Sequence, residues 1–155
     1  MDKIILMETH QYNVDLNWIA ARKGEISSPE LNDIIEVATP PEFPHGIAGN
    51  WSPEHLFTAA LSSCFMTTFL AIAENSNLEF KSLFCPARGI LSREDGKFTM
   101  SQVVLEPVLT ISNEKDRDKA EKILIKAEKA CLISNSITSE IFLITNLIVE
   151  ETIVV

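Results

Sequence analysis

Residues 52–74 read Ser-Pro-Glu-His-Leu-Phe-Thr-Ala-Ala-Leu-Ser-Ser-Cys-Phe-Met-Thr-Thr-Phe-Leu-Ala-Ile-Ala-Glu, and this stretch decides how the chain folds. Ser52 is a preferred helix N-cap, Pro53 fits the first helical position, and Glu54 lies near the positive end of the helix dipole. The apolar residues that follow occupy nearly every face, with only Ser and Thr between them. This pattern predicts a central helix that runs to about Glu74 and is buried all round.

Strands are predicted before this helix. Apolar residues indicate strands at 3–8 and 14–20, which we expect to pair, and a third strand at 34–37. The segment Arg22-Lys23-Gly24 is predicted to be a turn, and the Pro- and Gly-rich residues 40–51 are predicted to be a loop. The simplest arrangement is an antiparallel amino-terminal sheet.

Strands are also predicted after the helix, over residues 80–111. Asp95-Gly96 is a strong two-residue hairpin signal within this region. Pro86 and Pro107 each remove a backbone donor, so they mark edges, bulges or strand ends.

A second helix is predicted to open at Asn113 and Asp116 in the manner of a capping box. Its apolar residues recur every three or four positions and direct Cys131 toward the core. With a last strand within 141–150, the order strands, helix, strands, helix, strand indicates an α+β fold with largely antiparallel sheets. A length of 155 residues predicts a single domain, 1–155.

The composition argues against several classes of protein. Thirteen Lys and Arg against 22 Asp and Glu give a net charge of −9, which disfavours binding to nucleic acid or to an anionic membrane. The amino terminus has no signal-peptide pattern, and we expect no apolar span of 18 residues. The three cysteines, an odd number, are therefore expected to be reduced thiols in a soluble, cytoplasmic protein.

Motifs for nucleotide, zinc and hydrolase chemistry do not occur in the sequence. It contains no phosphate-binding Gly-rich loop, Cys-X-X-Cys, His-Glu-X-X-His or Gly-X-Ser-X-Gly. His10, His45 and His55 are scattered, and none stands at ligand spacing from a cysteine, so each is interpreted as a surface residue. No metal and no resident cofactor are expected.

Cys64 and Cys131 fall on predicted buried helix faces. A free buried cysteine is usually a small packing residue, and that interpretation stays open at this point. Chemistry needs the thiolate, which is a minor species at neutral pH for a thiol of pKa about 8.5. Cys64 lies about 18 Å from Ser52 along a straight helix, too far for the helix dipole to act alone. A cation is required, or a break near Ser62-Ser63 that restarts the helix.

Residues 52–65 resemble the Pro-Glu-x-Leu, Ala and Cys-Phe signature of the osmotically induced protein C and organic hydroperoxide resistance family (OsmC/Ohr), with ten positions from Glu54 to Cys64. Residues 130–135 are similar to the second cysteine segment of that family, and the segment Arg22-Lys23-Gly24 is similar to its arginine turn. The predicted order of elements also fits. The resemblance thus spans essentially the whole chain, and it implies an OsmC-like fold with two long helices and an intertwined dimer.

The resemblance implies a thiol peroxidase that reduces organic hydroperoxides. Cys64 would be the peroxidatic thiolate, and Cys131 would be the resolving cysteine that forms a disulfide with it. Arg22 would stabilise the thiolate, and Glu54 would hold Arg22. An external dithiol, of lipoyl or similar type, would reduce the disulfide. On one straight helix Glu54 and Cys64 are about 15 Å apart, too far to act together. A homodimer with sites at its interface would bring a Glu54 of one chain to the Cys64 of the other.

Other interpretations stay open. Leu132 stands where the family commonly has proline, and Ala20-Ala21 stand where glycines are usual in the hydroperoxide-resistance branch, so the subfamily is undecided. Cys85, which precedes Pro86, matches no family role and is interpreted as a packing residue. The alternative function is a non-catalytic OsmC-like dimer that binds an apolar ligand in the interfacial cavity, and a third interpretation has structural cysteines only. Apolar side chains around both thiols favour an apolar hydroperoxide over hydrogen peroxide.

Overall fold

The structure is a computed structural model that describes residues 8–153. Of the strand predicted at 3–8, residues 3–7 lie outside the described residues. The chain divides into two compact units, Met1–Pro53 and Glu54–Val155, and each is described by itself. The single domain expected over residues 1–155 stays a prediction.

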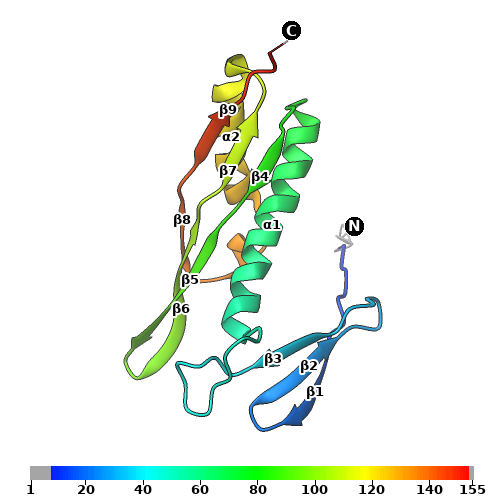
Figure 1. Cartoon of the computed structure of the whole chain (residues 1–155), viewed down its shortest axis with the longest axis vertical. Coiled ribbons are helices and arrows are strands. Elements are labelled where there is room, and N and C mark those ends of the chain that lie inside the picture. The colour runs from blue at the N-terminus through cyan, green and yellow to red at the C-terminus, as the bar shows by residue number, and fades with distance from the viewer. Residues whose placement is uncertain (1–7, 154–155) are drawn as a thin grey trace, which may run out of the picture. The chain divides into compact units, whose positions relative to one another are not determined.

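The first unit contains an antiparallel sheet in the order β1 (Asp15–Ala20), β2 (Lys23–Ser27) and β3 (Ile35–Ala38), shown in Figure 1. The sheet confirms the antiparallel arrangement predicted for this region. Strand β2 is not predicted by the sequence, because its residues Lys-Gly-Glu-Ile-Ser lack the alternation of a half-buried strand. Pairing with a neighbour on each side supplies the backbone hydrogen bonds that hold β2 extended.

The turn between β1 and β2 is Ala21-Arg22, so the predicted turn at Arg22-Lys23-Gly24 is wrong by one position. Lys23 already pairs with Ala20 in the ladder. Ala21 has a φ of +49°, in the left-handed region. A positive φ at the first central residue of a two-residue hairpin loop is a feature of type II′ turns, which favour glycine there.

Helix α1 (Pro53–Asn75) starts and ends as predicted and runs unbroken. Of the two alternatives considered, a cation or a break near Ser62-Ser63, the break is therefore excluded. The hydroxyls of Ser62 and Ser63 donate hydrogen bonds to the carbonyls of Ala59 and Ala60, at 3.2 Å each. These side chains thus bond back onto the helix they belong to and leave its backbone ladder intact.

The prediction that this helix is buried all round is wrong within a single chain. Its buried residues recur every four positions and form one stripe: Leu61, Phe65, Phe69 and Ala73. Met66 and Leu70, which follow two of them, are 43% and 41% exposed. One side of α1 therefore packs on the core, and an apolar side remains uncovered.

Three extended paths of the chain lie beside α1 in the second unit, and each consists of two strands separated by a two-residue interruption (Figure 1). The first path is β4 (Ser82–Phe84) and β5 (Ala87–Glu94), and the second is β6 (Lys97–Leu105) and β7 (Val108–Ile111). Pro86 and Pro107 lie in the interruptions, which confirms that they mark strand ends. Asp95-Gly96 form the predicted hairpin turn between β5 and β6, and both have positive φ.

The third path returns parallel to the second. Glu114–Asp116 form a short 3-10 helix, η1, capped by Asn113, and α2 (Arg117–Ala130) follows it. A second 3-10 helix, η2 (Ser134–Ser136), leads to β8 (Glu140–Leu143) and β9 (Asn146–Val149).

Strand β8 pairs parallel with β6, and β9 pairs parallel with β7. Four of the six strand pairings among the described residues are antiparallel, which confirms the largely antiparallel expectation. Two sheets are mixed, because the long crossover through α2 returns the chain in the same direction. One strand was predicted within 141–150, and the structure has two.

The core of the second unit lies between the two helices and the strands. Phe69 of α1 meets Phe80 edge to face, with ring centroids 5.3 Å apart. Strand β5 approaches the amino-terminal part of α1 closely, because Gly89 of β5 has no side chain. A Cβ on Gly89 would lie 2.2 Å from the Thr58 hydroxyl and 2.6 Å from the Met100 methyl group. Glycine thus sets the spacing between α1 and β5.

Helix α1 is long and apolar enough to cross a membrane by length and composition alone. The expectation of no apolar span of 18 residues is therefore wrong. The core helix of a soluble protein passes the same test, and a buried stripe of α1 belongs to the core of this unit. Its hydropathy is thus weak evidence for a membrane location.

Candidate functional site

Cys64 and Cys131 are brought together in the second unit. Cys64 lies in the middle of α1 and is partly buried against the core, and Cys131 follows directly after α2 and is 1% exposed. The two thiols lie close enough for each to shift the pKa of the other. Two cysteines 67 positions apart in the sequence are thus brought near each other, because both pack against the core of this unit.

The two thiols are shifted in opposite directions. Burial acts to raise the pKa of Cys64, but hydrogen bonds from Cys131, from the Ile133 amide, from Thr68 and from the Leu132 amide outweigh it and lower the pKa below 9.0. Burial raises the pKa of Cys131 above 9.0, and its hydrogen bond to Cys64 raises it further. Hydrogen bonds to a charged form favour that form, so Cys64 is the sulfur that ionises first.

The end of α2 holds Cys131 in place. The backbone amide of Cys131 donates to the Glu128 carbonyl at 3.3 Å, and the amide of Ser134 donates to the Cys131 sulfur at 3.5 Å. The Ser134 hydroxyl also donates to a Glu128 carboxylate oxygen at 3.0 Å. The turn after α2 is therefore tied to Glu128 in the last turn of the helix by two bonds and closed on itself by a third.

Glu54 lies in the first turn of α1, ten residues before Cys64. On the unbroken helix this corresponds to about 15 Å along the axis. Its Oε2 atom is buried and has no hydrogen-bond partner among residues 8–153. A buried carboxylate oxygen without a donor costs free energy, roughly 1–3 kcal/mol or more for a charged group. This oxygen is therefore suited to accept a hydrogen bond from a cationic side chain.

Arg22 lies in the first unit and is exposed. Its carbonyl accepts a hydrogen bond from the Thr39 amide at 3.1 Å, which fixes the backbone of its turn. No ion pair involves its guanidinium within the described part of the chain. The structure therefore brings Cys64 and Cys131 together, places Glu54 on the same helix as Cys64, and leaves the role of Arg22 a prediction.

Cys85 lies in the interruption between β4 and β5 and packs against the core, which fits its interpretation as a packing residue. Burial raises the pKa of Cys85 above 9.0. The three histidines, His10, His45 and His55, are exposed, as predicted. Among residues 8–153, no group of three or more His, Cys, Asp or Glu side chains is placed to hold a metal ion.

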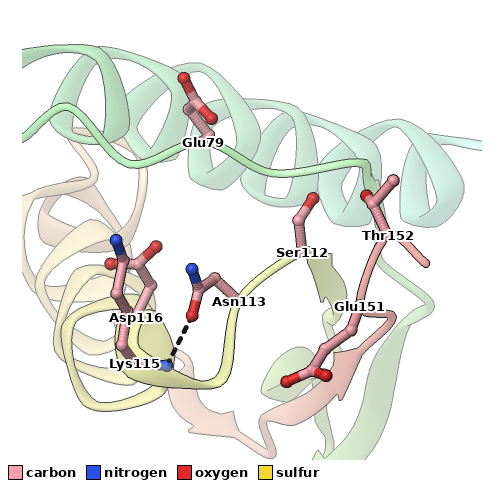
Figure 2. Close-up of a pocket in the computed structure, with 7 residues that line it drawn as sticks. All are labelled: Glu79, Ser112, Asn113, Lys115, Asp116, Glu151 and Thr152. Atoms are coloured by element: carbon pink, nitrogen blue, oxygen red, sulfur yellow. Dashed lines mark hydrogen bonds between the residues drawn. The ribbon is translucent and has the colours of Figure 1, made fainter. Parts of the chain in front are cut away.

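A polar cavity of about 400 Å³ lies elsewhere in the second unit (Figure 2). Its lining comprises Glu79, Ser112, Asn113, Lys115, Asp116, Glu151 and Thr152. Figure 2 shows the Asn113 side chain turned to the backbone amide of Lys115, from which it accepts a hydrogen bond at 3.1 Å. Neither cysteine of the pair lines this cavity, so it does not belong to the same site.

Sequence reasoning missed the polar groups around the sulfurs. The Thr68 hydroxyl lies 3.9 Å from the Cys64 sulfur, and its position four residues after Cys64 is a signal that helical periodicity could have given. The amides of Leu132, Ile133 and Ser134 carry no such signal, because backbone donors are the same in every sequence.

Comparison with known proteins gives a consistent family. The sequence model described as "OsmC-like protein" matches residues 46–146. An uncharacterized protein of Bacillus subtilis, YmaD, is 25% identical over 138 residues, which are 87% of this chain and 91% of that protein.

Solved structures share the fold. An OsmC-like protein of unknown function from Vibrio cholerae has a TM-score of 0.77 and is 27% identical in sequence. The match covers 90% of this chain and 100% of that chain. An organic hydroperoxide resistance protein OsmC from Legionella pneumophila has a TM-score of 0.70 and 22% identity, over 91% of this chain and 100% of that one.

Proposed function

This chain belongs to the OsmC-like protein family, and we propose that it is a thiol-dependent peroxidase that reduces organic hydroperoxides. Membership of a family with organic hydroperoxide resistance proteins among its structural relatives points to a peroxide-related redox function. The observation that carries the finer proposal is the proximity of Cys64 and Cys131, which pack against the same core, with the pKa of the first lowered and that of the second raised.

The reaction proceeds in two steps at the sulfurs. The Cys64 thiolate attacks the distal oxygen of the hydroperoxide, so a sulfur–oxygen bond forms, the oxygen–oxygen bond breaks, and the alkoxide leaves as the alcohol after it takes a proton. The resulting Cys64 sulfenic acid is attacked by the Cys131 sulfur. A disulfide forms, and the hydroxyl group leaves as water with the Cys131 proton.

An external dithiol completes the cycle. It reduces the Cys64–Cys131 disulfide by thiol–disulfide exchange and is itself oxidised to a disulfide. A lipoyl-type dithiol is one candidate for this reductant. No resident cofactor is needed, because all the electrons that reduce the peroxide come from the two thiols.

Glu54 and Arg22 supply the cationic part of the site in this proposal. The buried Oε2 of Glu54, which lacks a donor among the described residues, is the support for this assignment. A guanidinium held bidentately by a carboxylate keeps a fixed plane. An arginine at contact distance lowers a cysteine pKa by about 1–3 units.

A homodimer with its sites at the interface accommodates these roles. Because α1 is unbroken, Glu54 lies about 15 Å along the helix from Cys64 of the same chain. A second copy brings another Glu54 and Arg22 within reach of Cys64. The uncovered apolar side of α1, with Met66 and Leu70 more than 40% exposed, supports such an interface. Sedimentation should then give about twice 17.3 kDa.

Peroxide consumption by the pure protein tests the function. With dithiothreitol as reductant, cumene hydroperoxide should be consumed catalytically and faster than hydrogen peroxide. The Cys64→Ser variant is the matched control and should be inactive. No consumption above that control would reject the peroxidase. Binding of an apolar ligand by that inactive protein would then favour the non-catalytic alternative.

A further inference from the structure

The sulfur of Cys131 has a backbone hydrogen-bond donor of its own. The Ser134 amide donates to this sulfur at 3.5 Å. Cys131 is 1% exposed, so water scarcely reaches the sulfur and the donor comes from the chain itself. The amide belongs to the turn between α2 and η2. The shape of that turn therefore decides whether the amide meets the sulfur.

The side chain of Ser134 ties this turn back to the last turn of α2. Its hydroxyl donates to a Glu128 carboxylate oxygen at 3.0 Å, and both side chains are partly buried. A hydrogen bond to a carboxylate is stronger than one between neutral groups. Ser134 thus uses two donors for two acceptors: its amide reaches the Cys131 sulfur, and its hydroxyl holds the residue that carries this amide.

The backbone of the turn is held separately. The Cys131 amide donates to the Glu128 carbonyl at 3.3 Å, and the Asn135 amide donates to the Cys131 carbonyl at 3.1 Å. Both bonds use main-chain atoms, which a substitution at position 128 or 134 keeps. A change in either side chain therefore tests the bond between them and leaves the main-chain bonds in place.

We propose that Glu128 is a positioning residue for the step that forms the disulfide, because it holds the Ser134 amide on the Cys131 sulfur. This role rests on the proposed function, in which Cys131 attacks the Cys64 sulfenic acid. In that step the bond between the two sulfurs forms and the sulfur–oxygen bond of Cys64 breaks. Cys131 is oxidised, the Cys64 sulfenic sulfur is reduced, and the hydroxyl group leaves as water with the Cys131 proton.

Cys131 needs such a donor because it ionises with difficulty. Burial raises its pKa above 9.0, so the thiolate is a minor form at neutral pH. A hydrogen bond to the charged form of a group favours that form. The Ser134 amide therefore acts against burial and favours the attacking thiolate. Its displacement should slow the second step and leave the first oxidation, at Cys64, unchanged.

Two pairs of variants isolate the bond between the side chains of Glu128 and Ser134. Ser134→Ala removes the donor hydroxyl, which Ser134→Thr keeps. Glu128→Ala removes the acceptor oxygen, which Glu128→Gln keeps, and both of these remove the charge. Ser136→Ala is the matched control, because the Ser136 hydroxyl donates to the Leu132 carbonyl at 2.6 Å in the same turn.

The first measurement follows the Cys64 sulfenic acid in reduced protein after one equivalent of cumene hydroperoxide. Dimedone added at intervals traps the sulfenic acid, and peptide mass spectrometry gives its decay into the disulfide. Ser134→Ala should slow this decay about threefold to tenfold relative to Ser134→Thr, the effect of losing one typical hydrogen bond. Glu128→Ala should slow it similarly relative to Glu128→Gln, and Ser136→Ala should decay as the wild type does.

A double variant checks that both alanine changes break the same bond. Adding Ser134→Ala to Glu128→Ala should slow the decay little further, because the acceptor is already gone. The sulfenic acid should form at the wild-type rate in the Ser134 variants, since Cys64 is unchanged. With excess hydroperoxide its longer life in Ser134→Ala should yield more Cys64 sulfinic acid.

A second measurement does not depend on peroxide. In the Cys64→Ser protein, alkylation of Cys131 by iodoacetamide is followed against pH at the Cys131 peptide. Adding Ser134→Ala should move the midpoint to higher pH by about half a unit, whereas adding Ser134→Thr should not. This shift in a chain that consumes no hydroperoxide would support the placement of the amide by Glu128 and reject the proposed function.

The conservative variants make the proposal falsifiable. Equal decay in Ser134→Ala and Ser134→Thr, or in Glu128→Ala and Glu128→Gln, would overturn the role of Glu128 even in an active peroxidase. Equal slowing by Ser136→Ala would also overturn it, because any loosening of the turn would then suffice. If Ser134→Ala fails to fold by circular dichroism, Glu128→Ala against Glu128→Gln decides alone.

Discussion

Cys131 lies close enough to Cys64 for the two thiols to affect each other's ionisation, and this proximity shifts their pKa values in opposite directions. Burial acts to raise the pKa of both thiols, but the hydrogen bonds at Cys64 lower its pKa overall, while the nearby Cys64 raises that of Cys131 further. The structure thus distinguishes a sulfur that ionises early from one that keeps its proton. The division of roles in the proposed reaction follows from this asymmetry.

The pH dependence of alkylation should show this asymmetry directly. A lowered pKa means that the thiolate of Cys64 forms at lower pH, so its alkylation should reach half-maximal rate at a lower pH than that of an ordinary thiol. Cys85 and Cys131 should reach it at a higher pH than an ordinary thiol, because burial raises the pKa of both. Peptide-level mass spectrometry of the reduced protein gives all three profiles. The reverse order of Cys64 and Cys131 would contradict the assignment.

One equivalent of organic hydroperoxide should produce a Cys64–Cys131 disulfide. The two thiols already lie close enough to shift each other's pKa, and a disulfide requires Cα atoms roughly 4.4–6.8 Å apart. Cys85 packs in the interruption between β4 and β5 and should stay a free thiol. Non-reducing peptide mapping identifies the link. A linkage through Cys85, or a protein that stays fully reduced, is incompatible with the proposal.

The two cysteines should differ in what their loss removes. Cys64→Ser should abolish turnover, because a hydroxyl is a poor nucleophile at neutral pH. Cys131→Ser should still consume about one equivalent of hydroperoxide per chain in a first oxidation and then stop. Rapid-mixing measurement of the first oxidation distinguishes the variants, with Cys85→Ser as a control that should keep full activity. Equal loss of the first step in the Cys64 and Cys131 variants would reject the division of roles.

Removal of Arg22 should raise the pKa of Cys64 without abolishing the site. In Arg22→Ala, the first oxidation at pH 7 should slow by at least about tenfold, and higher pH should recover part of the rate. Arg22→Lys should recover only part, because an ammonium lacks the planar fork that Glu54 would hold. The neighbouring Lys23→Ala is a matched control, since the Lys23 ammonium pairs with Glu36 at 3.0 Å. An unchanged alkylation profile in Arg22→Ala would mean that Arg22 is a surface residue with no effect on the pKa of Cys64.

Gly89 should be intolerant of a side chain. In Gly89→Ala the new Cβ would meet the Thr58 hydroxyl at 2.2 Å, so α1 and β5 would have to move apart. We expect a loss of about 1–3 kcal/mol in the free energy of unfolding, measured by urea denaturation. In a protein that already carries Thr58→Ala, the further change Gly89→Ala should cost less unfolding free energy than it does in the wild type. Additive losses in the two single variants would show that the close approach is not the cause.

The sequence by itself determined the second unit's helices and its main hairpin. Local signals are sufficient there, because Ser52-Pro53 precedes an apolar run that can only bury itself as a long helix, and Asp95-Gly96 fits the positive φ values of a tight turn. The family resemblance named the residues that carry the proposed chemistry. It could not give their contacts, since Cys64 and Cys131 are brought together by helix packing and not by spacing along the chain.

The tertiary structure alone decided the parallel pairing of β8 and β9 and the strand identity of β2, because strand partners depend on backbone hydrogen bonds between distant segments. It also decided that α1 is unbroken and buried along one stripe only, which hydropathy cannot distinguish from burial all round. Finally, it brought Cys64 and Cys131 close enough to shift each other's pKa. Their proximity comes from the packing of distant segments against one core, which no local sequence signal records.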